Sequence, residues 1–351
     1  MSYYAGIRKI RDASMRSRTI DGLQRLRYGL SSQIPARTAT NTLLLATWNI
    51  RNFDDGKYGY RSDECYYYIA EILNHFDLIA IQEVRGSLYP LQNLRRILGS
   101  WWDFLVTDVT LGVAGNAERM AYLYDKRKVN FAGLAAELTL PRKKNTTSEP
   151  MQMARSPYIA GFRAGWAYLT LVTVHIYYGK NMAVEPRRLN EITELTKTLA
   201  QNASKLSCSP QYQIGRKPEP DNLIILGDFN IFNRADSTMA AITKSGFFVP
   251  DELQNIPGSN VEKNKHYDQI AYYKKLVRLK STGNAGVFDF YEYVYRHEDK
   301  MQYDEERKIK SGRSFNEWRT YRMSDHLPMW IEFNVDGADD YLDLLKSSVK
   351  I

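Results

Sequence analysis

The stretch NLIILGDFN at residues 222–230 constrains the fold more tightly than any other part of the chain. Its apolar residues run through Gly227 into Asp228, and Asn230 follows two positions later. A short, continuous apolar run of this kind predicts a strand that is covered on both faces. Such a strand either ends in an ordinary turn or holds its terminal carboxylate and carboxamide rigidly for chemistry.

Other apolar runs of similar length alternate with helical patterns along the chain. An apolar helical face between residues 63 and 76 separates the first two runs, and Pro186 opens a second helix before the fourth run. The repeated strand–helix–strand order predicts an α/β layered domain with sheets inside and helices outside. The expected strands lie at residues 43–48, 77–82, 169–174, 222–227 and 329–333.

The composition is that of a soluble globular protein, with 44% hydrophobic and 25% charged residues in a chain of 351. The longest apolar runs are far shorter than the roughly 18–20 residues that a membrane span needs, and no apolar segment opens the chain as a secretory signal would. The two cysteines, Cys65 and Cys208, are too few for a disulfide framework and lie in no zinc motif. We therefore expect a cytoplasmic protein with no membrane partner, although export as a toxin by a signal-less route stays open.

The formal net charge of +8 is concentrated at the start of the chain. Residues 1–40 hold eight basic and two acidic side chains, which leaves 40 of the 48 basic and 38 of the 40 acidic residues for the remainder. We therefore assign residues 1–42 to a basic N-terminal extension. Such an extension can contact nucleic acid or an anionic surface, or it can be a solvated helix, and it faintly resembles a transit peptide.

The remaining chain reads as one main domain over residues 43–335. Residues 291–322 are rich in Tyr, Arg, Lys and Glu and are interpreted as an insert, and residues 336–351 as a C-terminal tail. Loops are expected at 141–150 and 207–220, where turn-forming and charged residues cluster.

Each expected strand has polar, potentially catalytic groups at one end. Taken singly, every one has an ordinary explanation, because a lone histidine at a strand end is usually structural and an aspartate after a glycine is usually a turn residue. Taken together and in order, they predict a shared site. The residues are Asn49, Glu83, His175, Asp228, Asn230, Asp268, Asp325 and His326.

The ordered set WNIR, QEV, H, GDFN, YDQI and SDHLP, spread over residues 48–328, resembles the endonuclease/exonuclease/phosphatase superfamily. Its nearest branch is similar to deoxyribonuclease I. The resemblance leaves out residues 1–42, the tail and much of 291–322. It implies a four-layered α/β sandwich, in which two mixed β-sheets pack face to face with helices outside.

The resemblance also implies a metal ion. Glu83 would be its principal ligand, with Asn49 and Asp325 close by. Hard oxygen ligands of this kind suit Mg²⁺, and Mn²⁺ is the alternative. A group of acids gathered at one place would repel one another without a cation, which also favours a metal.

Two histidine–carboxylate pairs are implied in the same way: Glu118 with His175 and Asp268 with His326. Each carboxylate would orient its imidazole and stabilise the protonated form beside a phosphate. His326 would serve as general acid or base.

Asp228 would orient or deprotonate the attacking water, while Asn230 and His175 would donate hydrogen bonds to the phosphate. The reaction implied is metal-assisted hydrolysis of a phosphodiester, leaving 5′-phosphate ends.

Arg51, Arg85 and Arg155 match positions that face DNA in deoxyribonuclease I, and arginine there would bind phosphate without reading sequence. Each could instead be a surface ion-pair partner. Asn116 departs from the pattern, because the family has a stacking tyrosine at this position.

The leading prediction is a Mg²⁺-dependent endonuclease that cuts DNA with little sequence preference. The alternatives are the same chemistry on RNA or on a small or lipid phosphodiester, and a nucleic-acid-binding module without activity. An inhibitory or regulatory protein partner is also expected, since an unrestrained DNase would endanger its host.

Overall fold

The computed structural model describes residues 3–54, 56–111, 115–141, 152–209, 221–310 and 313–348. Most of the two loops expected at 141–150 and 207–220 lies outside these ranges. Among the described helices, none is both long enough and apolar enough to span a bilayer.

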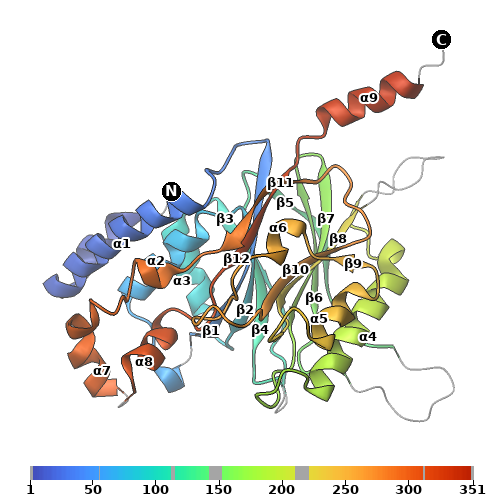
Figure 1. Cartoon of the computed structure of the whole chain (residues 1–351). Helices are drawn as coiled ribbons and strands as arrows, with labels where there is room; N and C mark the ends of the chain where they lie inside the picture. Colours follow the sequence, from blue (N-terminus) through green and yellow to red (C-terminus); the bar gives the residue numbers. More distant parts are fainter. Residues whose placement is uncertain are drawn as a thin grey trace.

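Two six-stranded sheets form the centre of the molecule (Figure 1). Both are mixed, because β1 pairs with β2 and β7 with β8 in parallel while the other pairs are antiparallel. In spatial order, the first sheet contains β11 (Lys280–Val287), β12 (Met329–Asn334), β1 (Thr42–Phe53), β2 (Leu78–Val84), β4 (Arg119–Asp125) and β3 (Trp102–Val106). The second contains β5 (Val129–Glu137), β6 (Tyr158–Ala164), β7 (Ala167–His175), β8 (Asn222–Asp228), β10 (Asp268–Tyr273) and β9 (Phe247–Phe248).

Helices cover the outer faces of the two sheets (Figure 1). The α-helices are α1 (Ala13–Gln33), α2 (Asp63–Leu73), α3 (Tyr89–Leu98), α4 (Pro186–Asn202), α5 (Ser237–Thr243), α6 (Asp251–Gln254), α7 (Asp304–Lys310), α8 (Phe315–Arg322) and α9 (Ala338–Ser348). Short 3₁₀ helices lie at Tyr4–Lys9, Gly56–Tyr58, Ala203–Lys205, Phe290–Glu292 and Lys300–Tyr303.

The burial of β1 shows how the layers are filled. Leu44 and Trp48 point to the outer core beneath α1 and α2, whereas Leu43 and Leu45 point to the core shared with the second sheet. Side chains alternate between the faces of a strand, so a strand covered on both faces is apolar throughout. This explains why the expected strands read as continuous apolar runs, and it confirms the four-layered sandwich.

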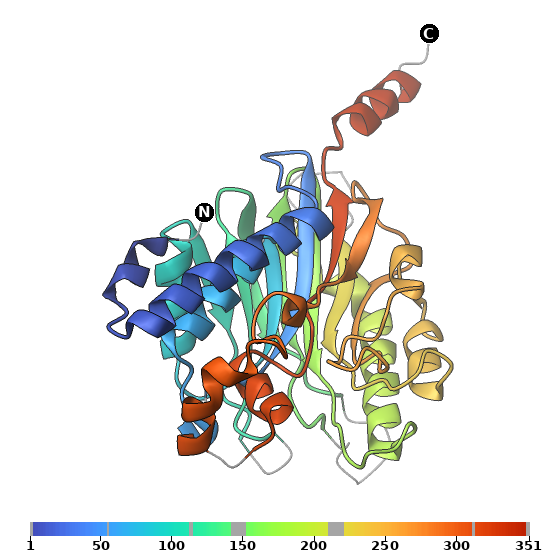
Figure 2. The same ribbon diagram turned by 60° about the vertical axis from the view of Figure 1, so that its left-hand side comes forward.

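The N-terminal helix α1 packs against α2 on the outer face of the first sheet (Figure 2). Leu26 and Leu30 of α1 are fully buried there. Much of the positive charge of residues 1–40 is therefore neutralised by the domain rather than presented on a free arm. The ion pairs join Arg18 to Glu64, Arg25 to Asp299, Arg27 to Glu71, and Arg37 to both Asp77 and Asp125.

The expected insert also packs on this outer core, through Tyr295 and Trp318. The C-terminal segment forms α9, which extends away from the sheets (Figure 1). The domain boundaries at residues 42 and 335 stay predictions.

Candidate active site

Gly227 lies near the end of strand β8, directly before Asp228. Its φ of 136° lies in the region that favours glycine. A Cβ at this position would lie 2.2 Å from the carbonyl oxygen of Val174 on β7. The glycine therefore lets the two strands run close together at their ends, where parallel pairing sets His175 beside Asp228. On the other side of β8, Asp268 of β10 pairs with Asp228.

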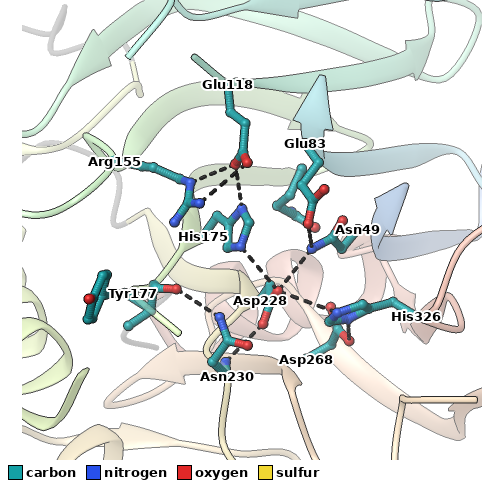
Figure 3. A network of polar contacts seen from close by, with 12 residues as sticks. Asn49, Glu83, Glu118, Arg155, His175, Tyr177, Asp228, Asn230, Asp268 and His326 are labelled. Atoms are coloured by element: carbon teal, nitrogen blue, oxygen red, sulfur yellow. Dashed lines mark hydrogen bonds and ion pairs between the residues drawn. The ribbon is translucent and has the colours of Figure 1, made fainter. Parts of the chain in front are cut away.

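Asp228 lies at the centre of the polar network (Figure 3). Its Oδ2 accepts a hydrogen bond of 2.9 Å from Nδ2 of Asn49. The same oxygen lies 3.5 Å from Nε2 of His175 and 3.6 Å from Nε2 of His326. Asp228 is buried, so these contacts act with little screening by water. One carboxylate thus faces both histidines that the sequence singles out.

Several residues of the site other than glycine have left-handed backbone conformations, among them Asn52 (φ 46°), Glu83 (φ 61°) and Asn230 (φ 53°). Such conformations cost on the order of 1–3 kcal/mol and persist where surrounding contacts impose them. The backbone N–H of Asn52 donates to Oε2 of Glu83 at 2.8 Å, and that of Asn230 donates to Oδ1 of Asp228 at 2.9 Å. The strained backbone therefore supplies the donors that hold two carboxylates in place.

The first histidine–carboxylate pair joins Glu118, just before β4, to His175 at the end of β7. Nδ1 of His175 lies 2.9 Å from Oε2 of Glu118. Nε of Arg155 contacts the same oxygen at 2.6 Å, and Arg85 and Asn116 approach Oε1 at 3.5 and 2.6 Å. Both carboxylate oxygens of Glu118 are therefore in contact with nitrogen groups of neighbouring side chains.

These neighbours set the protonation of the pair. Burial would raise the pKa of Glu118, but His175 and Arg155 lower it to about 2. Burial and Arg155 both oppose a proton on His175, yet Glu118 and Asp228 outweigh them and raise its pKa. The pair is therefore a carboxylate and an imidazole that readily binds a proton.

The second pair joins Asp268 to His326, which lies just before β12. Nδ1 of His326 is 2.8 Å from Oδ2 of Asp268, and both residues are buried. The ring of Tyr267 lies against His326, with the centroids 5.3 Å apart. Burial opposes the charged imidazolium, but Asp268 and Asp228 raise the pKa of His326 well above its ordinary value.

A cation fits the side of the site formed by Asn49 and Glu83. Both N–H groups of the Asn49 carboxamide donate to carboxylates, at 3.0 Å to Glu83 and 2.9 Å to Asp228. Its Oδ1 takes part in neither of these contacts, and it is buried without a hydrogen-bond partner in the described part of the chain. A buried carbonyl oxygen without a partner beside a carboxylate is the donor set that Mg²⁺ prefers.

A second combination of ligands shares Glu83. One atom each from Glu83, Glu118 and His175 can come within 4.8 Å of one another, which makes an acidic candidate metal site that the sequence analysis did not name. Glu118 and His175 are already paired, however, and the guanidinium of Arg155 beside them would repel a cation. The chemistry of the donors therefore favours Glu83 with Asn49.

Asp325 and Arg51 lie together at the rim. Nε of Arg51 is 3.5 Å from Oδ2 of Asp325, whose side chain is 42% exposed. The guanidinium of Arg51 also lies 3.9 Å from the centre of the Tyr321 ring. The contacts of Asp325 are thus with Arg51, and its role as a metal ligand stays a prediction.

Ser324 belongs to the SDHLP motif, but the sequence alone predicts no role for it. Oγ of Ser324 donates to the carbonyl oxygen of Asn49 at 2.6 Å and accepts the backbone N–H of His326 at 3.0 Å. This hydroxyl therefore links β1, which carries the metal-ligand candidate Asn49, to the segment before β12 that carries the catalytic candidate His326. The only hint in the sequence is that a small hydroxyl residue comes directly before Asp325 and His326.

This chain resembles curated proteins in sequence at low identity. No known family model matches the chain. A deoxyribonuclease from Thioalkalivibrio sp. is 26% identical over 305 residues, which cover 85% of this chain and 73% of that protein. The endonuclease/exonuclease/phosphatase family domain-containing protein 1 of Xenopus laevis is 26% identical over 265 residues, covering 69% of this chain but only 44% of the frog protein.

A solved structure gives the same picture for the fold. An endonuclease/exonuclease/phosphatase family protein from Bacteroides thetaiotaomicron superposes with a TM-score of 0.50 and 16% identity. The match covers 84% of this chain and 98% of that one. The two-sheet architecture is therefore shared over nearly the whole of the bacterial protein.

Proposed function

Because this chain belongs to the endonuclease/exonuclease/phosphatase superfamily, we propose that it is a divalent-metal-dependent endonuclease that hydrolyses DNA with little sequence preference. The observation that carries the proposal is the position of Asp228 between two histidine–carboxylate pairs. The name of the Thioalkalivibrio relative supports DNA as the substrate.

The proposed roles follow from which groups can accept a proton and which can donate one. Asp228 faces both histidines and is the acceptor that orients the attacking water. His326, held in its protonated form, donates a proton to the leaving 3′-oxygen, so that the product keeps a 5′-phosphate. The rigid mounting of both groups on strand ends provides the alignment that an in-line displacement needs.

The phosphate itself is held by donors. His175 carries a proton beside Glu118, and one N–H of the Asn230 carboxamide is bound to the carbonyl oxygen of Ile176 at 2.8 Å, which leaves the other for substrate. Glu83 and Asn49 would hold the metal ion. The ion, when bound, supplies a Lewis acid that stabilises negative charge on the phosphate oxygens.

Substrate selection is assigned to the arginines around the site. Arg85 and Arg155 both contact Glu118, and guanidinium groups clustered beside the site would attract a polyanion. Arginines that contact phosphates position a nucleic acid without reading its bases, which matches low sequence preference.

The test is incubation of the purified protein with supercoiled plasmid, linear duplex, single-stranded DNA and RNA, each with Mg²⁺, Mn²⁺ or EDTA. His175→Ala and Asp228→Asn are compared with the exposed control variants His297→Ala and Asp21→Asn. We expect metal-dependent nicking of the plasmid that both site variants lose and both control variants keep.

Three other results would each redirect the proposal. Cleavage of RNA alone moves the same chemistry to RNA. Salt-dependent binding of DNA without cleavage in any metal identifies a binding module. Wild-type cleavage that both site variants retain refutes this site, and small or lipid phosphodiesters would be tested next.

A further inference from the structure

A pocket of about 450 Å³ adjoins the proposed active site on the side of Arg85. It lies between the loop that follows β1 and the segment that joins β2 to α3, and its wall includes Asp54, Tyr60, Ser87 and Tyr89. Its volume falls within the roughly 300–1,000 Å³ typical of ligand pockets. Of the groups on its wall named here, only Arg85 has a role in the proposed function.

Two tyrosine rings give the pocket its chemistry. Tyr60 and Tyr89 are 70% and 62% exposed, although both belong to the pocket wall. Exposed aromatic side chains that line one hollow beside a site form an apolar patch of the kind that marks ligand-binding grooves. Their flat faces suit stacking on a planar ring.

Tyr89 is held in position from behind. Its ring meets that of Tyr66 edge to face, with centroids 6.4 Å apart and planes at 85°. The hydroxyl of Tyr66 donates to Oδ2 of Asp54 at 3.1 Å, and Asp54 accepts the backbone N–H of Arg61 at 3.1 Å. A chain of contacts through buried groups therefore fixes this wall before any ligand arrives, which lowers the entropy lost on binding.

Tyr60 is held by the helix of the predicted insert. The guanidinium of Arg322, at the end of α8, donates to the carbonyl oxygens of Tyr58, Gly59 and Tyr60 at 3.1, 3.1 and 2.9 Å. Arg322 is buried, so it is a fixed clamp rather than a mobile surface group. The loop that carries Tyr60 is therefore anchored at its backbone while its ring stays exposed.

Arg85 connects the pocket to the catalytic centre. It belongs to the pocket wall, and its guanidinium also lies 3.5 Å from Glu118, the partner of His175. A phosphate bound at Arg85 would thus lie between the pocket and the proposed reaction centre. In a nucleotide chain a base likewise projects from the backbone beside a phosphate.

We propose that this pocket is a nucleobase subsite, in which an unpaired base next to the scissile phosphodiester stacks on Tyr60 and Tyr89. The proposal rests on the proposed nuclease function and refines its substrate to a strand whose base is free to leave the helix. Stacking on aromatic rings tolerates any base, which agrees with low sequence preference. Duplex DNA must first unstack a base, so single strands are expected to bind more tightly.

The test measures binding in EDTA, where no cleavage occurs. Fluorescence anisotropy follows a labelled single-stranded oligonucleotide and a series in which one base at a time is removed and replaced by a stable abasic residue. Tyr60→Ala, Tyr89→Ala and the matching Phe variants are compared with Tyr28→Ala, which alters a tyrosine 75% exposed on α1. Thermal melts check that all variants fold.

We expect each alanine variant to bind the intact oligonucleotide roughly 5- to 150-fold more weakly, and each Phe variant to bind like wild type. Wild type should lose a similar factor when the base is removed at one particular position. In the alanine variants that removal should cost nothing further, because the stacking partner is already gone.

Cleavage assays in Mg²⁺ separate this inference from the nuclease proposal. If wild type cleaves DNA and both alanine variants bind and cleave as the Tyr28→Ala control does, the subsite is refuted and the nuclease proposal stands. If wild type cleaves no nucleic acid, the nuclease proposal falls, and the substrate refinement falls with it.

Discussion

The two histidine–carboxylate pairs are built alike but sit in different electrostatic surroundings. In each pair, one residue comes from the first sheet and the other from the second: Glu118 and His326 precede β4 and β12, whereas His175 and Asp268 lie on β7 and β10. Both imidazoles turn Nε2 toward Asp228. The arrangement is thus roughly symmetric about one carboxylate, although Nδ1 of His326 is hydrogen-bonded to its partner while Nδ1 of His175 is only in ion-pair contact with Glu118. The site exists only where the two sheets meet.

The charges around the pairs break this symmetry. Arg155 contacts Glu118 and counteracts its effect on His175, so the pKa of His175 is raised against two opposing influences. The groups that dominate around His326 are carboxylates, and its pKa is raised well above the ordinary value. Two imidazoles that face the same carboxylate can therefore take different tasks, His326 as the general acid and His175 as a donor to phosphate whose pKa is tuned by Arg155.

The largest expected effect comes from removing the carboxylate that the two pairs share. Asp228→Asn keeps the shape but removes the charge facing both histidines, so we expect kcat to fall about 10³-fold with a much smaller change in KM. Steady-state kinetics on a fluorogenic oligonucleotide measures this, with the exposed Asp21→Asn as control. A variant that keeps more than a tenth of wild-type kcat would show that Asp228 is not the shared acceptor.

The next prediction compares how much each pair contributes to the free energy of unfolding. Glu118→Gln leaves Arg155 beside a neutral side chain, and removal of one partner from a buried ion pair costs about 3 kcal/mol. Asp268→Asn leaves no arginine without its partner, and the new side chain can still accept a hydrogen bond from His326. The loss in the free energy of unfolding should therefore be nearer about 1–2 kcal/mol. Urea unfolding at pH 7 in EDTA gives both values, with the exposed Glu298→Gln as control. Equal costs, or the reverse order, would contradict the asymmetry.

The pH dependence of stability should also differ between the pairs. Because the pKa of His326 is raised in the folded state, its stabilising contribution is fully present below the unfolded pKa of about 6.5 and is lost as pH rises through the folded pKa. In that interval the folded protein holds one proton more than the unfolded chain, so the free energy of unfolding falls by up to about 1.4 kcal/mol per pH unit.

Unfolding measured between pH 6 and pH 9 in EDTA tests this slope. His326→Gln should remove most of it, and His175→Gln a smaller part over a narrower range, because the pKa of His175 is raised less. A slope that neither variant changes would mean that neither histidine holds the proton in the folded state.

The strand ends of this site are predictable because they are local features. An apolar run that meets a polar residue is visible in the sequence, and this pattern alone places Asp228 and His175 at strand ends. The apolar character itself follows from coverage on both faces of β7 and β8. The left-handed backbone at Glu83 is not predictable, because it is imposed by contacts with Asn52 rather than by residue type.

The partners of the arginines are the feature that the sequence could not reveal. The count of charges in residues 1–40 suggests an exposed basic arm, but Arg18 and Arg27 meet the buried carboxylates of Glu64 and Glu71 in the helix α2. The net charge of a segment can be counted from the sequence. The ion-pair partners of Arg18 and Arg27, however, lie more than 40 positions away and are brought close only by the tertiary fold. Arg155 is a further case, since its contact with Glu118 spans 37 positions.

The finest test of the asymmetry changes Arg155 alone. Arg155→Met removes the positive charge that opposes protonation of His175, so the pKa of His175 should rise, while that of His326, which lies beyond Asp228, should stay as in wild type. NMR titration of the two imidazoles in EDTA reads both values in one sample, and Arg155→Lys, which keeps the charge, should leave His175 closer to wild type. A fall in the pKa of His175 would mean that Arg155 acts chiefly by keeping Glu118 ionised and in place. The first pair would then depend on its arginine for its geometry, and the difference between the two histidines would have to come from the burial of their partners instead.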